Sequence, residues 1–156
     1  MNPQTPAAVT WPPPHGYAAT PHSYTLFCPP LITSPRIGRD FVASVLRALG
    51  LHQLVDVAAV CASELITNAY QHAKGVGSLL WLAVEAAYVR ITIYDGTPEP
   101  PVVGAGERAE RGEDEGGRGL VLVAALADDW GTVRGAPLGP VAGEGKGVWF
   151  TLAVAA

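Results

Sequence analysis

The sequence has little charge, few cysteines and no long apolar run, and each shortage excludes a class of protein. Charged residues make up 15% of its 156 residues, against about 25% in an average soluble domain. A disordered chain would combine low hydrophobicity with high net charge, whereas this chain is 49% hydrophobic with a formal net charge of −4. Two cysteines cannot build a disulfide framework. No apolar run reaches the roughly 18 residues of a membrane-spanning helix.

Basic residues are also scarce, with ten Lys and Arg against fourteen Asp and Glu. No basic stripe is present that would neutralise the phosphates of a nucleic acid, so we expect neither nucleic acid nor a membrane as a direct partner. The opening residues MNPQTPAAVTWPPPHGY lack a signal-peptide pattern. We therefore expect one soluble, cytoplasmic domain with reduced thiols.

Proline and glycine are abundant but unevenly placed. Nine of the 14 prolines lie in residues 1–35, and 13 of the 18 glycines lie at or after Gly96. Residues 1–21 therefore read as a Pro-rich flexible arm in front of a domain spanning residues 22–156. Its aromatic residues Trp11 and Tyr17 leave open whether the arm docks on a surface or is only a tail.

Charge is concentrated in one segment. The stretch Glu107–Arg118 holds eight of the 24 charged residues of the chain. Most of this stretch lies in a longer segment, from Gly96 to Gly117, that runs for more than 20 residues without an apolar period. A loop of that length in a compact domain is usually a functional lid or a disordered segment.

Apolar periodicity and turn residues predict helices and strands between these features. The predicted helices are Pro35–Leu49, with apolar Ile37, Phe41, Val45 and Leu49 four residues apart, then Gln53–Ala73 and Arg118–Ala127. The predicted strands are His22–Cys28, Ser78–Ala86, Tyr88–Tyr94, Trp130–Arg134 and Val148–Val154. This order is typical of an α+β two-layer sandwich, with a mostly antiparallel mixed sheet covered on one face by about three helices.

The helix predicted over Gln53–Ala73 places polar residues beside its apolar face. Glu64, Asn68 and His72 recur every four residues along that face or its border. A buried carboxylate or amide costs free energy unless it is hydrogen-bonded. The pattern therefore indicates a functional site, a hydrogen-bonded trio in the core, or a helical face misjudged by one residue. His72 alone is compatible with packing or capping.

Three glycine-containing segments bear on the choice. Asp95-Gly96 follows directly on the strand VRITIY, which places a carboxylate at a strand end. Gly116-Gly117-Arg118-Gly119-Leu120 opens a helix, whose unpaired N–H groups attract phosphate. The segment GEGKG at 143–147 lacks the spacing of a P-loop and is excluded as one.

The segments ELITNAYQHA, Asp-Gly at a strand end, a long loop and GRGLVLV follow one another in this order. Over roughly residues 22–154 the sequence resembles the GHKL superfamily of ATP-binding domains, which have the Bergerat fold. Within it the chain is most similar to bacterial anti-sigma-factor serine/threonine kinases and their stand-alone ATP-binding relatives. The resemblance is carried chiefly by the N-box residues Glu64, Leu65, Asn68, Ala69, His72 and Ala73.

This resemblance implies roles for the polar residues. Glu64 corresponds to the general base, and Asn68 to the ligand of a Mg²⁺ ion that bridges the nucleotide phosphates. Asp95 corresponds to the carboxylate that accepts a hydrogen bond from the adenine amino group. His72 matches the motif, as a packing residue or as a phosphate contact.

The resemblance also assigns the glycine segments. Gly117 and Gly119 fall on the phosphate-binding turn, with Arg118 and Leu120 beside them, and the segment Gly96–Gly116 corresponds to the ATP lid.

The sequence departs from the superfamily at two places. Asp95-Gly96-Thr97-Pro98-Glu99 lacks the glycine pair of the usual DxGxG box, so we expect the adenine pocket or lid hinge to be built differently. Relatives often begin the last strand with threonine, whereas this chain has Gly145-Lys146-Gly147 there and no threonine before Thr151. The resemblance therefore assigns no role to this strand.

The resemblance implies ATP and Mg²⁺ as cofactors and a kinase that phosphorylates an antagonist protein and sequesters a sigma factor. A nucleotide-dependent interaction module with little or no catalysis is the alternative, favoured by the altered Asp box. An unrelated α+β domain with chance motifs is the third reading, and a homodimer is left open.

Overall fold

The computed structural model of the chain describes residues 23–72, 75–97, 116–135 and 145–155. The predicted arm and residues 98–115 of the predicted lid lie outside these ranges. The helical elements are α1 (Ser34–Ala48), the short 3₁₀ helix η1 (His52–Leu54), α2 (Val55–His72) and α4 (Gly116–Leu126). The strands are β1 (Ser23–Cys28), β2 (Ser78–Val84), β3 (Tyr88–Asp95), β4 (Asp129–Arg134) and β5 (Lys146–Ala153).

The five described strands form one sheet in the order β1-β2-β3-β5-β4. Every pairing among them is antiparallel. β2 and β3 form a hairpin, closed by a hydrogen bond of 2.8 Å from the Glu85 amide to the Tyr88 carbonyl oxygen. Since β5 pairs with both β3 and β4, the C-terminal strand lies inside the sheet, next to the strand that carries Asp95.

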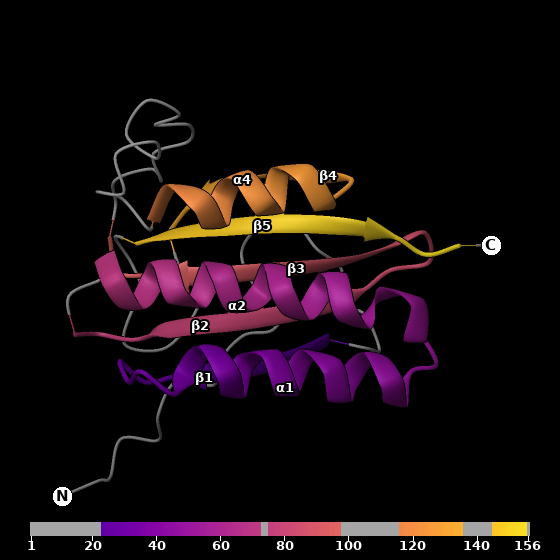
Figure 1. Cartoon of the computed structure of the whole chain (residues 1–156), viewed down its shortest axis with the longest axis horizontal. Coiled ribbons are helices and arrows are strands. Elements are labelled where there is room, and N and C mark those ends of the chain that lie inside the picture. The colour runs from indigo at the N-terminus through magenta and orange to yellow at the C-terminus, as the bar shows by residue number, and fades with distance from the viewer. Residues whose placement is uncertain (1–22, 73–74, 98–115, 136–144, 156) are drawn as a thin grey trace, which may run out of the picture.

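The described helices cover one face of this sheet. Figure 1 shows α1, α2 and α4 in front of the strands, with α2 in the middle. The predicted α+β two-layer architecture is therefore confirmed. The central position of α2 brings it against α1, α4 and β3, so residues on one helix can meet groups from several elements.

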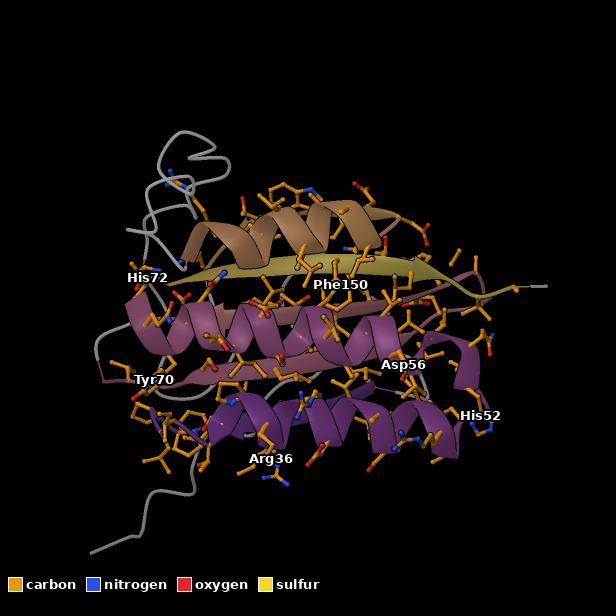
Figure 2. All side chains as sticks on the ribbon, viewed as in Figure 1. Arg36, His52, Asp56, Tyr70, His72 and Phe150 are labelled. Carbon is orange, nitrogen blue, oxygen red and sulfur yellow. The ribbon has the colours of Figure 1, made fainter. Side chains whose placement is uncertain are left out.

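The main core lies between the helices and the sheet. Fully buried apolar side chains meet there from both layers, among them Leu46, Ile66, Ile91 and Phe150. Figure 2 shows Phe150 between β5 and the helical layer. A smaller cluster of Leu79, Trp81, Ala83 and Tyr94 comes from β2 and β3, with Val133 of β4 packed against it, as expected when successive strand residues point to opposite faces.

The apolar period that predicts α1 does not coincide with the buried face of this helix. Ile37, the first residue of the predicted apolar row, is 52% exposed, although Val45 of the same row is buried. Val42 and Leu46, which each follow a residue of that row, are fully buried. Two apolar rows run along α1 one residue apart, and contact with α2 decides which of them is buried.

The second helix also differs in detail from its prediction. The residues from His52 to Leu54 form a 3₁₀ turn, and α2 itself begins at Val55. The buried arc of α2 is wide and includes Ala59, Ala62 and Ile66. These small and apolar residues are buried because α2 is covered on two sides, by α1 and by α4.

Candidate functional site

Four element ends meet at one end of the molecule. Figure 1 shows the end of α2, the end of β3, the start of β5 and the start of α4 together at the left of the view. Figure 2 places His72 at this end of α2 and Asp56 at the opposite end. The predicted polar residues of α2, the strand-end carboxylate and the glycine turn therefore belong to one region.

Glu64 and Asn68 lie on the border between the buried and exposed faces of α2. Both are half-buried, while the apolar residues that follow each of them, Leu65 and Ala69, are 3% exposed. Residues four apart on a helix share a face, so the carboxylate and the amide lie one above the other. His72 continues the row but is exposed at the helix end, which excludes a core-packing role for its side chain.

Gly119 of α4 lies against this pair. A Cβ atom built on Gly119 would stand 3.0 Å from Oε2 of Glu64 and 3.4 Å from Nδ2 of Asn68. The absence of a side chain at residue 119 thus leaves room for the two polar groups between α2 and α4. The resemblance assigns both the N-box and this glycine to the nucleotide site. The folded chain brings residues 64 and 119 together, although they are far apart in the sequence.

The first turn of α4 contains Gly116, Gly117, Arg118 and Gly119. The amides at the start of a helix have no intrahelical partner and carry the positive end of the helix dipole. Leu120 is 1% exposed and packs in the main core. Its side chain therefore anchors the helix, and only its backbone is available to a ligand; the contacts of the Arg118 side chain lie outside what the structure describes.

Asp95 is buried at the end of β3, with 5% of its surface exposed. Its Oδ1 accepts a hydrogen bond of 2.8 Å from the Thr97 amide, which closes a tight turn at the exposed Gly96. The Thr97 hydroxyl donates a hydrogen bond of 3.4 Å to the carbonyl oxygen of His72. This contact links the carboxylate turn to the end of α2.

Lys146 is a site residue that the sequence pattern did not single out. Its Nζ lies 3.0 Å from both carboxylate oxygens of Asp95, and the lysine is 7% exposed. The two residues face each other across β3 and β5, although they are 51 positions apart in the chain. The lysine was visible in the sequence within GEGKG, but only the strand register reveals its partner.

The charge of Glu64 affects a neighbouring thiol. Burial raises the pKa of Cys61 to about 11, and the negative charge of Glu64 acts in the same direction. Burial likewise raises the pKa of Cys28 to about 11, which a hydrogen bond with Ser78 partly offsets. Both thiols are protonated near neutral pH, so neither is a candidate nucleophile.

The polar groups of α2 suit Mg²⁺, which keeps water and phosphate ligands, better than a metal ion whose ligands all come from the protein. Among the described residues, no group of three or more His, Cys, Asp or Glu is arranged to hold a metal ion. Mg²⁺ needs only one or two protein oxygens when water and phosphate oxygens complete its octahedral shell. Asn68 can supply such an oxygen through its side-chain amide.

Comparison with known protein families finds a match that covers this region. The family model described as a histidine kinase-like ATPase domain matches residues 30–143, well over half of the chain. The match runs from before α1 to beyond β4 and so includes α2, the end of β3 and α4. No curated protein matches the chain. None of the described helices is long and apolar enough to cross a membrane.

Proposed function

Because the chain belongs to the histidine kinase-like ATPase domain family, we propose that it is an ATP- and Mg²⁺-dependent serine/threonine protein kinase of the anti-sigma-factor type. Membership in the family implies that the chain binds ATP and acts as an ATP-binding regulatory protein. The proposal adds that it phosphorylates a small antagonist protein and sequesters a sigma factor in the cytoplasm. The partner type is drawn from the resemblance of ELITNAYQHA and GRGLVLV to those kinases.

The observation that carries the kinase proposal is the pairing of Glu64 and Asn68 against Gly119. Phosphoryl transfer requires positioning, charge neutralisation and one group that orients the attacking hydroxyl. A carboxylate and an amide one turn apart, next to the start of α4, supply the last two requirements within one helix and its neighbour. Chemistry of this kind needs no further catalytic side chain.

Each residue has a distinct task in this proposal. Mg²⁺, when bound, neutralises the charge on the phosphates. Asn68 holds the ion through its amide oxygen, and the unpaired amides at the start of α4 receive phosphate oxygens. Asp95 accepts a hydrogen bond from the amino group of adenine. Glu64 accepts the proton of the substrate serine or threonine hydroxyl as its oxygen attacks the γ-phosphorus, and the bond from that phosphorus to the β–γ bridging oxygen breaks, so that ADP leaves.

The test separates ATP binding from transfer. Proteins retained by the purified chain with and without ATP and Mg²⁺ are incubated with [γ-³²P]ATP and wild-type chain, and label on serine or threonine is measured. We expect Glu64→Gln to bind ATP as wild type does but to transfer label at least about 100-fold more slowly, since general-base catalysis contributes roughly 10²–10⁴-fold. Unchanged transfer by Glu64→Gln would rule out this base.

Asp56→Asn is the matched control, because Asp56 is an exposed carboxylate on the same helix. This variant should change neither ATP binding nor transfer of the label.

The alternative function, a nucleotide-dependent interaction module, is favoured by the altered Asp box, in which Thr97-Pro98-Glu99 replaces the glycine pair. Stoichiometric ATP binding without label on any retained protein would establish that alternative and exclude the kinase.

A further inference from the structure

The buried ion pair between Asp95 and Lys146 goes beyond the roles that the family resemblance assigns. Lys146 approaches both oxygens of Asp95 equally, at 3.0 Å, and its side chain is as deeply buried as its partner's. The resemblance assigns Asp95 a contact with adenine and assigns no role to Lys146. A cation that touches the base-reading carboxylate must lie next to any base that this carboxylate holds.

Stability alone is a weak reason for such a pair. Removing two charges from water costs about as much as their attraction returns, and apolar pairs of similar size are often as stable. The positions opposite each other elsewhere on β3 and β5 include apolar pairs such as Ile93 with Val148 and Ile91 with Phe150. The ionic pair occupies the last described register position, where the candidate nucleotide site lies.

The hydrogen bonds of the pair leave one acceptor direction open. Oδ1 of Asp95 accepts from both the Thr97 amide and Lys146, whereas Oδ2 accepts only from Lys146 among the described contacts. A carboxylate oxygen has two lone pairs, so Oδ2 retains one for an incoming N–H group. An acceptor and a cationic donor therefore lie side by side.

Lys146 also has a donor that is easily redirected. Its third contact is with the carbonyl oxygen of Thr97 at 3.4 Å, which is long compared with the usual distance of about 2.9–3.0 Å for an N–H···O bond. Exchanging this contact for a ring nitrogen of a ligand would cost little.

We propose that Lys146 reads the adenine base, by donating a hydrogen bond to ring nitrogen N1 while Oδ2 of Asp95 accepts one from the N6 amino group. Adenine presents a donor at N6 beside an acceptor at N1, which complements the carboxylate and the ammonium group. Guanine in the same orientation presents an acceptor to the carboxylate and a donor to the ammonium group. The pair therefore both holds adenine and rejects guanine, and this inference rests on the proposed function.

The experiment compares ATP with 1-deaza-ATP, in which a C–H group replaces N1, by isothermal titration calorimetry of the full chain. Wild type should bind ATP about 10- to 100-fold more tightly than 1-deaza-ATP, the discrimination expected when a base loses a good hydrogen-bonding partner. Lys146→Met should bind both nucleotides with nearly equal, weakened affinity. Arg134→Met is the matched control, because Arg134 is an exposed cation opposite Lys146 on β4; it should keep the wild-type ratio.

Two outcomes would overturn the proposal. Wild type that binds ATP and 1-deaza-ATP equally well excludes a contact with N1, and this measurement needs no variant to fold. A Lys146→Met variant that keeps the wild-type ratio shows that the lysine has only a structural role. If wild type binds no ATP at all, the proposed function fails as well, whereas ATP binding without dependence on N1 removes only the role of Lys146.

Discussion

Gly119 is a residue of α4 that lies directly against the candidate catalytic groups. The space that a Cβ atom would fill is bordered by the Glu64 carboxylate, the Glu64 Cβ and the Asn68 amide. Two effects oppose each other when a side chain is introduced here. Alanine favours a helix over glycine by roughly 1 kcal/mol, but its methyl group would displace the polar pair by a few tenths of an ångström.

We therefore expect Gly119→Ala to weaken ATP binding without unfolding the protein. The melting temperature should change by only a few degrees, because the helix preference offsets the tighter contact, while ATP affinity should fall about tenfold or more, as expected for a misplaced polar pair. Thermal melting and calorimetric titration check the two parts separately. Ala125→Gly, which changes an exposed residue of the same helix, isolates the helix preference; unchanged ATP affinity in Gly119→Ala would show that the space beside Glu64 is not needed.

At the scale of elements, the arrangement depends on the turn that leads from α2 into the sheet. Gly77 has φ +85°, a left-handed conformation that favours glycine. Its missing Cβ would lie 2.5 Å from the carbonyl oxygen of Cys28 and 3.0 Å from the ring of Phe27. The turn therefore packs directly on β1, one of the two edge strands of the described sheet.

Gly77→Ala should destabilise the fold by roughly 2 kcal/mol or more, because both the left-handed backbone and the contact with β1 oppose a side chain. Gly75→Ala is the matched control, since Gly75 has φ +87° but no atom within 4 Å of its missing Cβ. The free energy of unfolding of Gly75→Ala should fall only by the cost of the left-handed backbone, about 1 kcal/mol. Urea unfolding measures the difference, and equal losses in the two variants would show that the contact with β1 contributes nothing.

At the scale of the whole molecule, the two layers bury both cysteines in one core. Cys28 comes from the sheet and Cys61 from α2, and they are 2% and 0% exposed. Because burial raises the pKa of each thiol from its ordinary value of 9.0 to about 11, the folded state retains protons that the unfolded chain releases at alkaline pH. The stability of the fold is thus linked to pH through its core.

The free energy of unfolding should fall as pH rises from 8 to 10, by about 1 kcal/mol for each thiol. The sign follows because the unfolded chain binds fewer protons than the native state between pH 9 and 11, so alkaline pH favours unfolding. Urea unfolding at several pH values, with a reductant present, measures the slope. Cys28→Ala and Cys61→Ala should each flatten it, and a wild-type slope in both variants would contradict the assignment to the thiols.

The sequence by itself determined the element order, the α+β class and the placement of Glu64 and Asn68 on one helical face. These features follow from local geometry, since helical and strand periodicities relate residues only a few positions apart. Local periodicity could not decide which apolar row of α1 is buried, because both rows satisfy it.

Tertiary structure alone decided which distant groups meet. Gly119 reaches Glu64 because α4 packs beside α2, and Lys146 reaches Asp95 because the register of β3 and β5 aligns residues 51 positions apart. A shift of that register by one residue would turn the lysine to the other face of the sheet. The packing of the entire core fixes the register, and no segment of the sequence encodes it locally.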